Sequence, residues 1–301
     1  MNFEHVALVA LLRLRPGGLN WRKLTEQVLD YGSASAVWEF HTSQELLPSP
    51  DATHALFEAE TDLARWRDQG LSFISILDDE FPQRLLDIVE TPPFLVAQGT
   101  TSRRDLGLSV VGSRKASERG LDMARSIATN IAAGGLTVIS GLAAGIDTAA
   151  HTAALSAGGR TVAFIATGSL RTYPAANKSL HAEIADRGLV LSQFWPDASP
   201  ARYTFLMRNA LMSGYGLATI VVEAGETSGA RAQARMAVEH GRPVILSDLV
   251  VESNAWAREL LHKPGVSVAS SIREISDIVE RIREQPRRTH DALRVLAQTH
   301  R

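Results

Sequence analysis

From residue 108 onward, short apolar runs alternate with longer segments of helical pattern, and this alternation constrains the fold most strongly. The runs are rich in branched apolar residues, which is typical of strands buried in a parallel sheet. They lie at 108–111, 136–139, 161–166, 189–193, 218–223, 243–247 and 266–269. The helical segments lie at 117–133, 145–157, 177–187, 204–213, 228–240, 253–262 and 271–284. This order predicts an α/β fold with a doubly wound, mostly parallel sheet.

The first 70 residues lack this alternation and have a helical pattern instead. Helices are expected at 3–14, 21–29 and 51–69. The residues that follow predict a strand at 71–77, a helix ending near Glu90 and a strand at 94–97. A chain of 301 residues is long enough for two domains. We expect a small helical domain at 1–70, an α/β domain at 71–284 and a basic tail at 285–301.

Composition excludes several classes of site. The chain has no cysteine, so a disulfide, a thiol nucleophile and a thiolate zinc site are impossible. Its histidines lack metal-ligand spacing, and no serine lies in a Gly-x-Ser-x-Gly turn. The formal net charge of −2 argues against a generally basic nucleic-acid binder, so affinity for phosphate must come from a local patch. We therefore expect no metal, no cofactor and no catalytic activity.

The sequence also bears on location. The absence of disulfides is typical of the cytosol. The apolar segment at 3–14 is too short to span a membrane and has no basic leader. We expect a cytoplasmic protein that makes no membrane contact.

Two glycine-containing turns follow the first two strands of the alternation. The first turn is Gly112-Ser113-Arg114-Lys115, and the second runs from Ser140-Gly141 to Gly145. Ligands of doubly wound folds bind at the carboxyl ends of the strands, and the helix after each turn offers N–H groups to an anion. Two turns with a basic pair predict a phosphate cradle. The alternative is that both are plain strand-to-helix turns in which glycine only relieves strain.

Further polar residues fall at the same edge of the predicted sheet. Asn177 has the residue type of a helix N-cap, and Lys178 follows it where the helix dipole disfavours a cation. A bound anion would account for this lysine, although a solvated surface lysine remains an alternative. Asp147 and His151 lie four residues apart on one helical face, and we expect a structural rather than a catalytic role for them. Tyr173, Phe205 and Trp195 are candidate faces for stacking on bases; core packing is the alternative for Tyr173 and the favoured role for Phe205.

The ordered set of motifs resembles the DNA-processing protein A family, also called DprA or Smf. The resemblance covers roughly residues 70–245. It is carried by Val110–Lys115, Ser140–His151, Tyr173-Pro174, Arg208-Asn209, Glu223-Ala224 and Ser228-Gly229. The lead-in at Asp79–Leu85 is similar too, with Phe81 where tyrosine is more usual.

The resemblance implies an extended Rossmann-like domain that binds single-stranded DNA, protects it and assists the loading of a RecA-type recombinase during natural transformation. It also implies a homodimer. In the family's motifs Arg114 contacts DNA phosphate, Lys178 is the lysine after Tyr-Pro, and the glycine turns supply backbone donors. The expected nucleic-acid-binding residues are Gly112, Ser113, Arg114, Lys115, Ser140, Gly141, Gly145, Tyr173, Lys178, Arg208, Asn209, Ser228 and Gly229.

The chain departs from the family at the helix start Ser228–Gln233 and after the strand at 243–247. We expect a divergent member without the C-terminal winged helix of many members. These departures leave a second function open, namely a nucleotide-sensing or nucleotide-hydrolysing domain, as in phage defence. The hydrolase variant has less support, because the Pro-Gly-Gly-x-Gly-Thr-x-x-Glu signature of cytokinin-activating enzymes is replaced by Glu223–Gly229.

Overall fold

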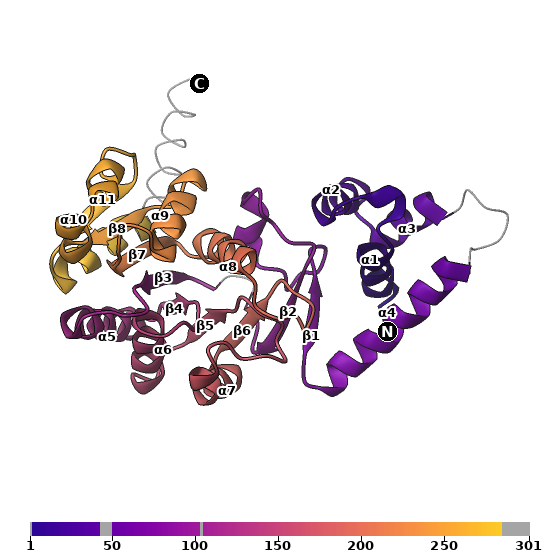
Figure 1. The fold of residues 1–301 in the computed structure, drawn as a ribbon, viewed down its shortest axis with the longest axis horizontal. Coiled ribbons are helices and arrows are strands. Elements are labelled where there is room, and N and C mark those ends of the chain that lie inside the picture. The colour runs from indigo at the N-terminus through magenta and orange to yellow at the C-terminus, as the bar shows by residue number, and fades with distance from the viewer. Residues whose placement is uncertain (1, 43–49, 103–104, 285–301) are drawn as a thin grey trace, which may run out of the picture. The chain divides into compact units, whose positions relative to one another are not determined.

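The computed structural model describes residues 2–42, 50–102 and 105–284, and the expected tail at 285–301 lies outside them. The chain divides into two compact units (Figure 1). The first unit holds the described residues of 1–105 and 162–211, and the second holds those of 106–161 and 212–284. No helix in this described part of the chain is long and apolar enough to cross a membrane.

The first unit begins with helices that pack on one another. α1 (Phe3–Leu14), α2 (Trp21–Tyr31) and α4 (Pro50–Asp68) match the three expected segments, whereas α3 (Ala34–Thr42) is a helix that the pattern did not predict. The carboxylate of Glu4 caps α3, since its Oε2 accepts N–H bonds from Ala34 at 2.6 Å and from Ser35 at 3.3 Å. The Ser33 hydroxyl caps the same end locally, since it accepts the Ala36 N–H at 3.1 Å, so Ser33 was the signal in the sequence for the start of α3.

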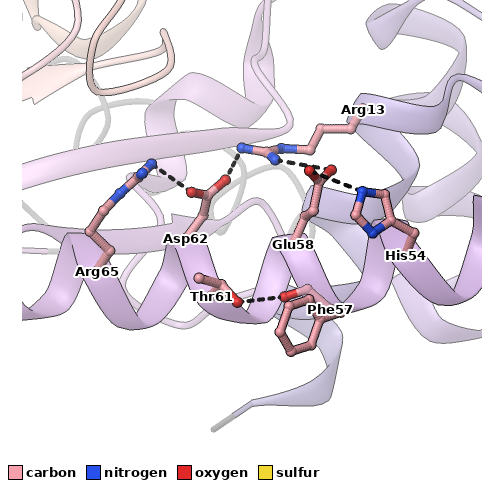
Figure 2. Close-up of polar contacts among 7 residues, drawn as sticks. All are labelled: Arg13, His54, Phe57, Glu58, Thr61, Asp62 and Arg65. Atoms are coloured by element: carbon pink, nitrogen blue, oxygen red, sulfur yellow. Dashed lines mark hydrogen bonds and ion pairs between the residues drawn. The ribbon is translucent and has the colours of Figure 1, made fainter.

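An ion-pair network joins α1 to α4 (Figure 2). The Asp62 carboxylate is 7% exposed and lies between two guanidinium groups, those of Arg13 and of Arg65 at 2.5 Å. Arg13 also reaches Glu58 at 3.8 Å, and His54 lies 3.3 Å from the same glutamate. The buried position of Asp62 makes this network more important for packing than an exposed ion pair would be.

Aromatic rings attach these helices to the strands of the first unit. Trp195 stacks on Phe94 with ring centroids 4.8 Å apart, and it meets Trp21 at 5.3 Å and Trp66 at 5.8 Å. The guanidinium of Arg13 lies 5.7 Å from the centre of the Trp195 ring. With these neighbours, the half-buried Trp195 packs the helices against the strands; its stacking on DNA bases stays a prediction.

The strands of the first unit are β1 (Ser72–Ser75), β2 (Phe94–Gly99), β6 (Leu189–Ser192) and β5 (Thr161–Phe164), in that order across the sheet. The pairs β1–β2 and β2–β6 are antiparallel and β5–β6 is parallel. Helices α7 (Lys178–Arg187) and α8 (Arg202–Tyr215) follow β5 and β6 in the chain.

The second unit is the more regular part of the fold. Its strands run in the order β4 (Thr137–Ser140), β3 (Gly107–Gly112), β7 (Ala218–Glu223), β8 (Val244–Ser247) and β9 (Val266–Ala269). Every pair among them is parallel. In Figure 1, α5 (Glu118–Ala133) and α6 (Ile146–Ser156) cover one face of these strands, and α9 (Gly229–Glu239) and α10 (Asp248–Ser253) cover the other. The predicted α/β class with a mostly parallel sheet is confirmed.

Three local predictions are wrong. The helix expected to end near Glu90 is only the five-residue 3-10 turn Gln83–Asp87. The segment at 253–262 begins with the end of α10 and continues as α11 (Ala255–Leu260), because Asn254 is extended and its amide donates to the carbonyls of Ala224 and Val250. Asn177 makes no side-chain cap, since the 3-10 turn Ala175–Asn177 runs directly into α7.

Candidate nucleic-acid interface

In the second unit, the loop between β3 and α5 presents two exposed cations, Arg114 and Lys115. Its backbone is fixed by three hydrogen bonds to Ser113. The Ser113 N–H donates to the Glu223 carbonyl at 2.7 Å, and its own carbonyl accepts from Ile146 N at 3.2 Å. Its hydroxyl accepts from Lys115 N at 3.1 Å. The two cations therefore project from a braced loop.

The second glycine turn packs directly against this loop. Gly145 has φ +78°, and a Cβ placed there would lie 2.3 Å from the Ser113 carbonyl oxygen and 2.9 Å from the carbonyl carbon of Arg114. Only glycine allows this approach. The structure thus brings the two turns together, as expected from their places after the neighbouring strands β3 and β4.

The backbone groups of these turns are mostly engaged inside the protein. The Gly141 N–H donates to Asp147 Oδ2 at 3.1 Å, and the Ser140 hydroxyl donates to the Val110 carbonyl at 2.7 Å. Because the Ser113 N–H is also engaged, the prediction that Ser113 and Gly141 offer backbone donors to phosphate is wrong in this conformation. Gly112 ends β3 opposite Glu223 and has a structural place in the sheet.

The expected acid and base in this unit have structural contacts. Asp147 is 5% exposed, and its Oδ2 also accepts from Ala143 N at 3.3 Å, so its carboxylate shapes the loop before α6. His151 is fully buried, with Nδ1 2.7 Å from the Thr161 hydroxyl. At the start of α9, Ser228 is the N-cap and its hydroxyl accepts from Arg231 N at 3.2 Å, while Gly229 is exposed.

Sequence reasoning missed the main role of Glu223. Its carboxylate accepts the Ser117 N–H at 3.0 and 3.1 Å and the Ser117 hydroxyl at 2.6 Å. It lies so close to the first turn of α5 that a Cβ on Gly120 would be 2.2 Å from Oε2. A glycine inside a helical pattern signals such a close approach, and Gly120 within the segment 117–133 was that signal.

In the first unit, Tyr173 and Lys178 lie exposed around the start of α7. Tyr173 is 45% exposed, and its ring meets that of the half-buried Phe205 edge to face at 5.6 Å. The loop before α7 is anchored by His181, whose Nδ1 lies 3.0 Å from the Thr172 hydroxyl and whose Nε2 lies 3.0 Å from Gln98 Oε1. Burial lowers the pKa of His181, which favours the neutral ring.

Arg208 and Asn209 differ from the expectation. Both are only 5% exposed on α8, and the Arg208 guanidinium donates to the Phe164 carbonyl at 3.1 Å. This hydrogen bond ties α8 to the last residue of β5. As the structure stands, neither side chain is available to a DNA strand.

Comparison with known proteins gives a consistent result. The model of the DNA recombination-mediator protein A family matches residues 72–283. The DNA processing protein DprA of Streptococcus pneumoniae is 40% identical over 177 residues, which are 58% of this chain and 62% of that protein. The Protein Smf of Synechocystis is 36% identical over 57% of this chain and 44% of its own length. A putative DprA of Mycobacterium tuberculosis is 33% identical over 84% of this chain and 69% of its own length.

Solved structures agree with these relatives. The crystal structure of DprA from Streptococcus pneumoniae has a TM-score of 0.68 and 31% identity, and the match covers 88% of this chain and 95% of that one. DprA from Helicobacter pylori, whose structure concerns its single-stranded DNA binding mode, has a TM-score of 0.62 over 70% of this chain and 96% of its own. At 24% identity the latter shows the fold alone. The chain spans less than two thirds of the length of the first curated relatives it matches. It belongs to the DNA recombination-mediator protein A family.

Proposed function

We propose that this protein binds single-stranded DNA, protects it and assists a RecA-type recombinase in recombination, without catalysing a reaction. The observation that carries the proposal is the braced loop with Arg114 and Lys115. Both cations are exposed while the backbone that holds them is fixed by neighbouring strands and turns. Because this backbone is already held in place, binding of phosphate requires little ordering of the main chain.

The first unit supplies candidate groups of the same chemistry. Lys178 is an exposed cation, and Tyr173 is an exposed ring held on edge against Phe205. Cations read the phosphate backbone and aromatic faces accept any base, so the expected binding is independent of sequence and sensitive to salt. The solved structure of the Helicobacter pylori protein concerns its single-stranded DNA binding mode, and the proposal assigns the same class of ligand to this chain.

The absence of catalysis is part of the proposal. Asp147 and Glu223 are the acids near the glycine turns, and both accept backbone N–H bonds that shape loops. A general base must instead be within reach of a bound substrate. Incubation with nucleoside monophosphates, ATP and single-stranded DNA, followed by chromatography, is expected to show no turnover. Turnover that is lost in Glu223→Gln would favour the nucleotide-enzyme alternative.

The direct test is binding of a labelled oligothymidine by anisotropy. Arg114→Ala and Lys178→Ala are each expected to weaken binding by about tenfold while the far-UV circular dichroism is unchanged. Arg125→Ala on α5 and Arg187→Ala on α7 are the matched controls, because each removes an exposed cation that pairs with an acid on its own helix. If all four variants lose affinity equally, the binding is a general charge effect and the assigned site is wrong.

The proposed assembly is a homodimer, and the proposed location is the cytoplasm. Two binding sites on one strand raise the effective concentration for the second contact. Light scattering at micromolar concentration is expected to give twice the chain mass. A monomer that still binds a long oligonucleotide tightly would remove the argument for a dimer.

A further inference from the structure

We infer that Glu223 is a positioning residue for DNA binding, and that its carboxylate acts as an internal anion at the N-terminus of α5. In nucleotide-binding proteins with this type of fold, a ligand phosphate takes the N-terminus of the helix after the first strand. Here a side chain of the protein fills that place. The inference deepens the proposed function, and the part of it that concerns DNA binding rests on that function.

The contacts of the carboxylate are those of a bound anion. It receives the Ser117 N–H on both oxygens, at 3.0 and 3.1 Å, and the Ser117 hydroxyl on Oε2 at 2.6 Å. Gly120 leaves the space that Oε2 occupies, since a Cβ there would lie 2.2 Å from it. α5 has 16 residues, so its N-terminus carries the full positive end of a helix dipole.

The same residue holds both ends of the cationic loop. The backbone carbonyl of Glu223 accepts the Ser113 N–H at 2.7 Å, and its carboxylate accepts from Ser117. Arg114 and Lys115 lie between these two anchors. Since β7 fixes Glu223 at its own last position, the loop is tied to the sheet at its start and at its end.

This arrangement has a consequence for ligand choice. A second anion beside Ser117 would meet the charge of Glu223 and would find the Ser117 N–H and hydroxyl already donating to that carboxylate. This arrangement favours phosphate binding through the side chains of Arg114 and Lys115. That geometry suits a strand passing over the loop and disfavours a mononucleotide whose phosphate needs the helix end.

The experiment replaces the internal anion with an external one. Thermal unfolding of the wild type, Glu223→Ala and Glu118→Ala is measured in formate, inorganic phosphate and chloride at equal ionic strength. Glu118 is the matched control, because it is an exposed acid on the same first turn of α5. Only Glu223→Ala is expected to lose thermal stability in chloride and to regain it with saturation in formate or phosphate.

The second arm measures oligothymidine binding. Glu223→Ala is expected to lose about tenfold in affinity, equivalent to a charged hydrogen bond, and to recover most of it in formate. Arg114→Ala is not expected to recover. If the wild type does not bind oligothymidine, the proposed function fails, while the anion-dependent stability of Glu223→Ala still decides whether the internal anion exists.

Two results would overturn the inference. One is a folded Glu223→Ala protein whose stability has the same anion dependence as that of Glu118→Ala. If Glu223→Ala does not fold, Glu223→Gln retains the volume and one acceptor, and it is expected to bind oligothymidine more weakly than the wild type. Unchanged affinity in a folded Glu223→Gln protein is the other contradicting result.

Discussion

Replacing Gly145 with alanine tests whether the two glycine turns form one rigid structure. Gly145 has φ +78° and ψ −123°, a region that residues with a side chain rarely adopt. The added Cβ would also lie 2.3 Å from the Ser113 carbonyl oxygen, which belongs to the backbone and has no flexible end to move aside. The loop that carries Arg114 must shift to relieve the contact.

The magnitude follows from these two terms. Backbone strain contributes about 1–3 kcal/mol, and the steric overlap contributes about 1–3 kcal/mol. Gly145→Ala is therefore expected to lower the free energy of unfolding by about 2–6 kcal/mol, measured by urea denaturation. Affinity for oligothymidine is expected to fall as well, because Arg114 moves with Ser113.

Gly135→Ala is the matched control in the same unit. Gly135 has φ +68°, but no heavy atom lies within 4 Å of the position of its Cβ. This change carries the left-handed backbone penalty alone, about 1–2 kcal/mol, and leaves DNA binding unchanged. Equal destabilisation of Gly145→Ala and Gly135→Ala, with equal DNA affinity, would refute the reasoning.

Two further predictions concern the first unit. Burial lowers the pKa of His181 in the folded protein below its ordinary 6.5. At pH values between the lowered pKa and 6.5, the unfolded chain therefore binds a proton that the native state does not. The contribution of His181 to the free energy of unfolding is therefore complete above about pH 6.5 and falls on acidification by up to about 1.4 kcal/mol per pH unit. His181→Gln should flatten this pH dependence in urea denaturation experiments. An unchanged pH profile would exclude His181 as its source. Asp62→Asn should lower the free energy of unfolding by about 1–3 kcal/mol, since Asp62 is buried between Arg13 and Arg65. The exposed Asp122→Asn should change it by less than about 0.5 kcal/mol, and equal effects in denaturation curves would argue against the buried network.

The sequence predicted the order of strands and helices from residue 108 because each element has its own apolar periodicity. It also located the two glycine turns. At Gly145 the reason for glycine is the positive φ and the close approach of the Ser113 carbonyl. The start of α3 was missed although Ser33 is a local N-cap, and the carboxylate of Glu4 on another helix adds to that cap. Residue type misled at Asn177, where a 3-10 turn continues into the helix.

The candidate site was harder to predict for a related reason. Sequence motifs indicate where backbone donors lie, but they do not show which donors the protein itself uses. The Ser113 N–H donates to Glu223, which is distant in the chain, and the Gly141 N–H donates to Asp147, which lies six residues further on. Arg208 was expected to bind nucleic acid, yet it is buried on α8, where its guanidinium donates to the Phe164 carbonyl.

The central claim is that exposed cations on a braced loop bind the phosphates of single-stranded DNA. The most direct measurement is the salt dependence of oligothymidine binding by the wild type and by Arg114→Ala. The wild type is expected to give a log–log slope of roughly −2 to −4, and Arg114→Ala a slope smaller by about 0.7 for one lost phosphate contact. Binding that is indifferent to salt, or an Arg114→Ala protein with the wild-type slope and affinity, would contradict the account.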